Sequence, residues 1–171
     1  MQMVKKIFIV LGLGWFAILL FMPKQELYYK LEEILEKKSI KINEQSIHTG
    51  LFSLRLENVD IYAKGIKLAT AESVDFFTLL FYTKVEVDNL VLDDSLKKLA
   101  PTHIDELVIS HGIGKPFQLQ VEAKGVFGAL DGNINLNKKI IRLNFDENSS
   151  IEQLKSKLEQ DDKGWYYEAS F

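Results

Sequence analysis

The chain opens with one uninterrupted apolar run, Ile7 to Met22, and this run constrains the rest of the molecule more than any other feature. Lys5 and Lys6 precede it and Pro23 follows it. At 1.5 Å per residue, 16 helical residues reach about 24 Å, which approaches the ~30 Å hydrocarbon core of a bilayer. The run therefore predicts an N-terminal transmembrane anchor. The anchor residues expected to face lipid are Ile7, Phe8, Val10, Leu11, Trp15, Phe16, Leu19, Leu20 and Phe21.

A cleaved signal peptide also combines a basic start with an apolar stretch, but it needs small residues just before its cut site. Here the run ends Leu20-Phe21-Met22-Pro23, so we expect a retained anchor. Downstream lysines such as Lys24 weaken the charge asymmetry that sets orientation, and a short cytoplasmic N-terminus remains the favoured arrangement. This predicts a single-pass protein of the bacterial inner membrane with its C-terminal domain in the periplasm.

Three segments are expected: the anchor at 1–22, a juxtamembrane amphipathic helix at 23–38, and a β-rich domain at 39–171. We expect the apolar face of the amphipathic helix to pack on the domain, and the alternative is that it lies on the bilayer surface. Four residues at helical spacing form that face: Leu27, Leu31, Ile34 and Leu35.

After the helix the apolar residues alternate with period two, which is typical of strands. The parity of this alternation switches near Glu57 and Asn58, and a switch of this kind indicates a bulge or a strand break. The apolar patch at 76–82 is expected in the core, as a helical turn that closes the end of a sheet. Lipid or partner contact is the alternative for this patch.

A capping-box spacing that begins at Ser150 predicts a helix from Ile151 to about Gln160. The expected fold class is therefore α+β and mostly β. It has an N-terminal transmembrane helix, a short amphipathic helix, and a curved, mainly antiparallel sheet with one C-terminal helix.

Composition and motifs give no support for an enzyme. The 21 basic and 24 acidic residues provide no basic surface for nucleic acid, and the absence of cysteine excludes disulfides, thiolate nucleophiles and zinc–cysteine sites. His103 and His111 would lie about 26 Å apart on one predicted strand, so they cannot share a metal ion or a proton. We expect no catalytic residue, no cofactor and no metal. The sequence does not set the oligomeric state.

Two short features point to modification and to a partner. Asn148, in Asp146-Glu147-Asn148-Ser149-Ser150, is an Asn-x-Ser acceptor that resembles the extended acceptor of bacterial periplasmic N-glycosylation. Its alternative role is a polar turn that caps the helix predicted after it. The last residues predict an aromatic strand that could add to a neighbour's sheet. The residues of this partner strand are Trp165, Tyr167 and Phe171.

A further pattern spans roughly residues 20 to 136. It comprises Gly50-x-x-x-Leu54-x-Leu56-x-Asn58-Val59-x-Ile61 and Ala123-x-Gly125-x-Phe127-Gly128-x-x-x-Gly132-x-Ile134-x-Leu136. Together with the anchor, this pattern resembles the type II secretion protein N group, which is similar in turn to the AsmA-like envelope proteins. The resemblance implies an inner-membrane anchor, a short helix and a curved periplasmic sheet.

The favoured function is that of a non-enzymatic structural or assembly component of a multiprotein envelope machine, either of secretion type or a flagellar-motor scaffold. Its expected partners are the lipid bilayer and other envelope proteins. The alternative is an AsmA-like lipid-binding or lipid-transfer protein, in which the sheet holds acyl chains in an apolar groove.

Overall fold

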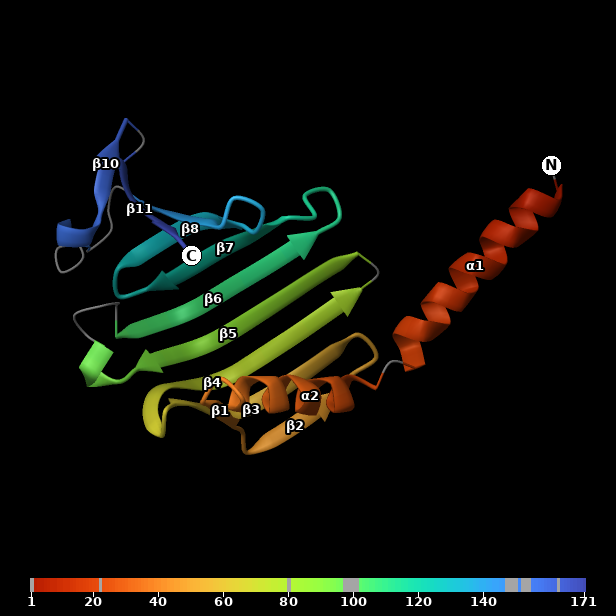
Figure 1. The fold of residues 1–171 in the computed structure, drawn as a ribbon, viewed down its shortest axis with the longest axis horizontal. Helices are drawn as coiled ribbons and strands as arrows, with labels where there is room; N and C mark the ends of the chain where they lie inside the picture. The colour runs from red at the N-terminus through yellow and green to blue at the C-terminus, as the bar shows by residue number, and fades with distance from the viewer. Residues whose placement is uncertain are drawn as a thin grey trace.

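The structure is a computed structural model, and it describes residues 2–21, 23–79, 81–96, 102–146, 151, 155–162 and 164–171. Two helices, α1 (Gln2–Phe21) and α2 (Lys24–Glu36), come first, and an 11-stranded antiparallel sheet follows (Figure 1). α1 projects away from the sheet, whereas α2 lies against one edge of it. The expected mainly antiparallel sheet is confirmed, and a helix, α2, lies within the segment 23–38.

The strands run mostly as consecutive hairpins, in the order β1-β3-β4-β5-β6-β7-β8-β9-β11-β10, and β2 pairs with β3 beside β1. Two short 3₁₀ turns, η1 (Asp94–Leu96) and η2 (Lys155–Lys157), lie in the connections. The strands are β1 (Ile40–Asn43), β2 (Ser46–Thr49), β3 (Ser53–Ala63), β4 (Ile66–Leu79), β5 (Tyr82–Leu92), β6 (His103–Gly112), β7 (Gln118–Gly125), β8 (Gly128–Asn135), β9 (Ile140–Phe145), β10 (Glu159–Asp161) and β11 (Gly164–Ser170).

The register of these pairs aligns the apolar residues of eight strands on one face of the sheet, which we call the apolar face. Residues directly opposite one another in an antiparallel pair share a face, so a chain of such pairs forms a row. The opposite face is polar, as the row Arg55–Asp75–Glu86 illustrates. The apolar face consists of two rows, Leu56–Val74–Val87–Leu107–Ala123–Leu130–Phe145–Trp165 and Leu54–Phe76–Val85–Ile109–Val121–Gly132–Leu143–Tyr167.

The parity switch in β3 falls at Asn58, which has a φ of 50° and lies between the paired residues Glu57 and Val59 of one continuous strand, whereas the register shift of this ladder lies between Ile61 and Tyr62. Asn89 in β5 has a φ of 49° and likewise falls between two paired residues, Asp88 and Leu90, in the ladder between β5 and β6. Asn is among the few residues that adopt this left-handed conformation at low cost. The aligned interruptions let the apolar residues of both strands return to the same face after the switch.

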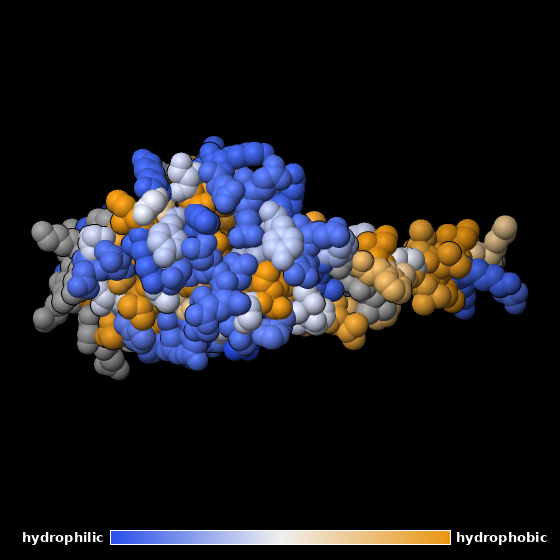
Figure 2. Space-filling model, turned by 90° about the horizontal axis from the view of Figure 1, so that it is seen from below, coloured by the Kyte–Doolittle hydropathy of each residue, from blue (hydrophilic) through white to orange (hydrophobic). Residues whose placement is uncertain are grey.

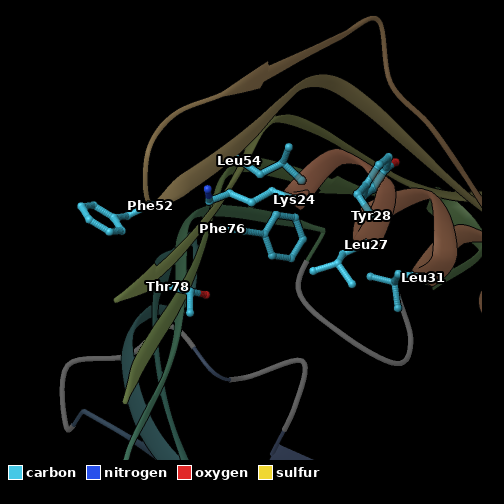
Figure 3. A pocket seen from close by; sticks show the side chains of 8 residues that line it. All are labelled: Lys24, Leu27, Tyr28, Leu31, Phe52, Leu54, Phe76 and Thr78. Atoms are coloured by element: carbon cyan, nitrogen blue, oxygen red, sulfur yellow. The ribbon is translucent and has the colours of Figure 1, made fainter. Parts of the chain in front are cut away.

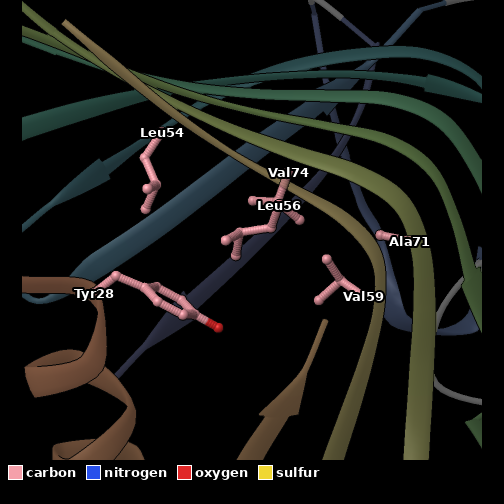
Figure 4. Packing of buried hydrophobic residues seen from close by; sticks show 6 residues of the cluster. All are labelled: Tyr28, Leu54, Leu56, Val59, Ala71 and Val74. Carbon is pink, nitrogen blue, oxygen red and sulfur yellow. The ribbon is translucent and has the colours of Figure 1, made fainter. Parts of the chain in front are cut away.

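Two separate clusters of buried side chains lie on the apolar face. The first is at the α2 end, where Tyr28 packs on strands β3 and β4 (Figure 4). The second is near the other edge, where Phe127 and Phe145 meet edge to face with ring centroids 6.3 Å apart. The first cluster comprises Tyr28, Leu54, Leu56, Val59, Ala71 and Val74, and the second comprises Ala123, Phe127, Phe145 and Ile151.

The predicted C-terminal helix is wrong. Its capping-box residues lie outside the described residues, and the described remainder forms η2 and then β10, which pairs with β11. Ile151 and Leu158 both pack against the second cluster, so tertiary contacts hold this segment in an irregular path. A helix of about ten residues is marginal by itself, and packing therefore overrides its local signals.

The predicted transmembrane helix is also wrong. Among the described residues, no helix is both long and apolar enough to cross a bilayer. α1 includes Gln2, Lys5 and Lys6, which leaves about 15 apolar residues from Ile7 to Phe21, or about 22 Å of helix against a core of about 30 Å. The single-pass inner-membrane location, and the periplasmic placement that depended on it, are corrected accordingly.

Two local expectations also change. The 76–82 patch forms the end of β4 and the start of β5 instead of a helical turn, because Phe76 and Phe77 continue the pairing with β3 and β5. On α2, Tyr28 is the buried residue, at 3% exposure, whereas Leu27 is exposed. The apolar face of the helix therefore does not pack on the sheet in the way that its spacing suggested.

Candidate functional site

An apolar pocket of about 200 Å³ lies between α2 and the start of the apolar face. α2 contributes one wall, and the facing ends of β3 and β4, with the residue that precedes β3, contribute the other (Figure 3). Six of its eight lining residues are apolar or aromatic. The lining residues are Lys24, Leu27, Tyr28, Leu31, Phe52, Leu54, Phe76 and Thr78.

Lys24 is the one charged residue in this lining. It is the first residue of α2, and its side chain extends across the pocket with the nitrogen on the side of Phe52 (Figure 3). The residue is half-buried and forms no ion pair with any residue that the structure describes. A lysine can bury its aliphatic stem against apolar surface and keep its ammonium at the mouth of a site. This arrangement presents a positive charge beside an apolar cavity.

Tyr28 fixes the position of α2 on the sheet. Its ring packs in the first cluster, and its hydroxyl donates a hydrogen bond of 2.8 Å to Oε2 of Glu44. Burial and the neighbouring Glu44 raise the pKa of Tyr28, so the hydroxyl stays protonated and acts as a donor. Burial also raises the pKa of Glu32, and the negative charge of Glu44 adds to this. This hydrogen bond ties α2 to the connection between β1 and β2, where Glu44 lies.

Leu27 and Leu31 of α2 line the pocket instead of being buried on the sheet. Leu27 and Leu31 are 46% and 39% exposed, and both line the cavity. Ile34, one turn further on, is 47% exposed and is not among the lining residues. Full burial of a leucine side chain contributes roughly 1.5–3 kcal/mol to stability. The folded chain gains only part of this free energy from Leu27 and Leu31, and a ligand that covers them would gain the rest.

The pocket continues into the apolar face. Leu54 and Phe76 line the pocket and begin one of the two apolar rows, and Val85 and Ile109 extend that row with half-buried side chains. Eight strands at spacings of about 4.8 Å make the rows about 34 Å long. The pocket is thus one end of a longer apolar track.

The residues of the predicted anchor all fall in α1. Their side chains are exposed by 42% to 84% in the described set, and the side chains of Leu19 and Leu20 lie outside what the structure describes. Trp15 stacks on Phe81 at a centroid distance of 6.0 Å, and Phe16 approaches Phe52 at 6.1 Å. These aromatic residues were expected against lipid, and their ring contacts with Phe81 and Phe52 were not predicted from the sequence.

The other predicted sites are dispersed. Asn148 lies outside the described residues, so its modification stays a prediction. Trp165 packs against the second cluster, Tyr167 is 36% exposed, and Phe171 is 60% exposed. The strand that carries the first two is already paired with β9 over Trp165–Ser170 and with β10 over Gly164–Tyr166. Only its last residues present an edge to a neighbour.

The three histidines have separate surroundings. His48 lies 3.5 Å from Glu57, His103 lies 2.8 Å from Asp105, and Nε2 of His111 lies 3.1 Å from the carbonyl oxygen of Pro116. Within the described part of the chain, no three His, Cys, Asp or Glu side chains come together as a metal site.

Comparisons of the chain with protein-family models, with curated proteins and with solved structures found no match. The resemblance to the type II secretion protein N group and to AsmA-like proteins therefore stays a prediction. What defines the candidate site is its geometry: an apolar pocket, a lysine within it and an apolar face that continues it.

None of the eight lining residues was predicted as a site residue from the sequence; Leu27 and Leu31 were expected only on the apolar face of the helix. Tyr28 is adjacent to Leu27 and shares the helical spacing of Leu31 and Leu35, so it was a legitimate candidate for the buried position. Nothing in the local sequence marks Thr78, because its role depends on where β4 ends relative to α2.

Proposed function

We propose that the protein binds an acyl-chain amphiphile with an anionic head group. The observation that carries this proposal is the pocket in which Leu27 and Leu31 face an apolar cavity beside the ammonium of Lys24. An apolar lining with one well-placed charged group is the usual composition of a small-molecule site. The lysine supplies the charge complementarity that selects an anionic amphiphile over a neutral one.

The dimensions support an extended ligand. A pocket of about 200 Å³ is smaller than the roughly 300–1,000 Å³ of typical ligand sites, so it would hold only the part of the chain next to the head group. A helix is about 10–12 Å wide and strands are about 4.8 Å apart, so α2 can cover two or three strands. The backbone of α2 lies nearest β1, β2 and β3. The rest of the acyl chain would then lie along the apolar rows of the following strands.

Fluorescence of cis-parinaric acid tests the proposal on the full-length chain. We expect saturable binding that Leu31→Glu weakens at least tenfold, because the substitution places a carboxylate in the apolar lining. Ile34→Glu is the matched control, since Ile34 lies on the same helix with similar exposure but outside the pocket. Equal affinities for the two variants would refute the site.

The head-group assignment has its own test. A hydrogen bond to a charged group contributes about 1.5–3 kcal/mol, so Lys24→Gln is expected to weaken binding of the acid by roughly tenfold or more. The methyl ester of the same acid should bind the variant and the native chain alike. A variant that loses the acid and the ester equally would show that Lys24 packs against the ligand without recognising its charge.

A structural role in a protein assembly is the second candidate, and the edge of β11 favours it. Tyr167–Ser170 pairs with β9 on one side and extends beyond the pairing with β10 on the other. An extended segment from a partner could add there by backbone hydrogen bonds. Native mass spectrometry of the purified full-length chain separates the two candidates. Bound lipid supports the first, and a stoichiometric protein partner without lipid supports the second, either in a secretion-type machine or in a flagellar-motor scaffold.

A further inference from the structure

The turns at one end of the sheet expose a line of large apolar side chains. The connections β2–β3, β4–β5, β6–β7 and β8–β9 all lie at this end because consecutive strands alternate in direction. The C-terminus lies there as well, since Ser170 pairs with Ile140. We call the exposed apolar residues of these turns and of the C-terminus the rim. The rim comprises Leu51, Phe81, Ile113, Phe117, Leu136 and Phe171, with exposures from 44% to 67%.

Neighbouring parts of the rim are joined by backbone hydrogen bonds. The amide of Ile113 donates to the carbonyl of Phe81 at 3.1 Å, and the amide of Leu136 donates to the carbonyl of Phe117 at 2.9 Å. The amide of Phe171 donates to the carbonyl of Lys139 at 3.0 Å. The rim is therefore a continuous edge held by the sheet, and its apolar side chains are not scattered singly over the surface.

α1 leaves the molecule at the same end. Figure 1 shows it beside the β4–β5 turn, and the ring contact of Trp15 with Phe81 joins the helix to the rim. Figure 2 shows the hydrophobic surface of α1 next to a body that is mostly hydrophilic on the face drawn. The apolar surface of the molecule is thus concentrated towards this end.

Positive charge accompanies the rim. Lys115, Lys138 and Lys139 lie in its turns, are exposed, and form no ion pair among the described residues. The chain as a whole has a net charge of −3, so this local excess of lysine runs against the overall balance. Among the described residues, the connections at the opposite end of the sheet carry both signs of charge: Asp93, Asp94, Asp146 and Asp162, together with Lys64, Lys155 and Lys157.

We propose that the rim docks on the surface of an anionic lipid bilayer. Exposed apolar and aromatic tips enter the interfacial region of a bilayer, and flanking lysines gain about 1 kcal/mol each near anionic head groups, which corresponds to about fivefold in binding. A protein partner is disfavoured because the cores of protein interfaces are depleted in lysine. Among the described residues, the opposite end exposes Ile66, Val91 and Val126, beside connections that carry both acidic and basic residues.

Docking at the rim would also orient the pocket. Phe52 and Thr78 lie at the rim ends of β3 and β4, and both line the pocket with Lys24. The pocket mouth would then face the head groups from which an amphiphile enters. Docking itself does not depend on a filled pocket, so its test is separate from the ligand-binding test.

The chain has no cysteine, so single-cysteine variants give unambiguous labelling. We expect an NBD (nitrobenzoxadiazole) label at Ile113→Cys or Leu136→Cys to shift to the blue on vesicles of phosphatidylglycerol and phosphatidylethanolamine. A label at Val126→Cys is the control, because Val126 is equally exposed at the far end. Doxyl-labelled lipid should quench the rim labels and leave the control label unquenched.

Vesicle pelleting of the full-length chain supplies the second readout. Lys115→Gln combined with Lys138→Gln should lower partitioning into the anionic vesicles about 25-fold, with no change on phosphatidylcholine, whereas Lys64→Gln at the far end should have no effect. The proposal is overturned if the chain stays in solution. It is also overturned if vesicle-bound chain keeps its rim labels in water, because α1 alone would then account for binding, or if the control label shifts to the same extent. A partner protein that protects the rim labels in the absence of vesicles would equally reject a lipid surface.

Discussion

Replacing Tyr28 tests how α2 is held on the sheet. Tyr28 is 3% exposed and is the buried residue of α2, and its ring packs on Leu54 and Leu56. Truncation of a buried aromatic side chain to alanine costs about 3–5 kcal/mol, because the lost transfer energy adds to the cavity left behind. We therefore expect Tyr28→Ala to lower the free energy of unfolding by about 3–4 kcal/mol, as measured by urea unfolding followed by far-UV circular dichroism.

Two further variants separate the ring from the hydroxyl. Tyr28→Phe keeps the ring but removes the donor of the 2.8 Å hydrogen bond to Glu44, which should cost about 1–2 kcal/mol because a half-buried carboxyl oxygen loses its donor. Tyr29→Ala is the positional control: its ring lies 5.9 Å from that of Tyr28 but is 49% exposed, so its loss should cost less than about 1 kcal/mol. If Tyr28→Ala is no more destabilising than Tyr29→Ala, then α2 is not held by this residue.

Three further predictions concern two positions in the sheet and one carboxyl group on α2. Gly132→Ala should destabilise the protein by more than about 2 kcal/mol, because an added methyl would overlap the backbone of the neighbouring strand, whereas Gly112→Ala, which meets nothing within 4 Å, should be neutral in the same urea assay. Asn58→Val should lower the melting temperature, with a cost of about 1–2 kcal/mol from the positive φ. Glu32→Gln should raise stability at pH 7, because it removes a charged form that burial and Glu44 disfavour. Burial and Glu44 raise the pKa of Glu32 above its ordinary 4.5, so the folded chain binds the proton more tightly and stability falls as the pH rises through that pKa. A pH series of unfolding curves should be flatter for this variant, and an unchanged slope would contradict the assignment.

Much of the sheet was predictable because period-two alternation is a local signal. The one-face-wet strand around Val121, the hairpin of β8 and β9 and the parity switch at Asn58 all follow from side-chain alternation and turn residues. The predicted helix after Ile151 failed for the opposite reason. Its capping signal is local, but the path of this segment is set by contacts with Phe127 and Phe145, which are distant in sequence.

The candidate site was less accessible to sequence reasoning. Its lining comes from the start of α2, the turn before β3 and the end of β4, which only the antiparallel register brings together. Helical spacing identified Leu27 and Leu31 correctly as one face but could not tell whether that face meets a sheet or a cavity. Tyr28 occupies the buried position on α2, and Leu27 and Leu31 therefore lie on the side of the helix that lines the pocket.

The placement of these leucines connects the pocket with the rim. Monomeric proteins rarely keep large contiguous apolar patches exposed, and the patches that they keep are usually functional. Here Leu27, Leu31 and Lys24 line the pocket, and the rim lies at the same end of the sheet. If the two surfaces act together, a vesicle that contains cis-parinaric acid should transfer it to the native chain faster than to the variant that lacks Lys115 and Lys138. The same variant should bind the acid normally from solution, and equal transfer rates would show that pocket and rim work independently.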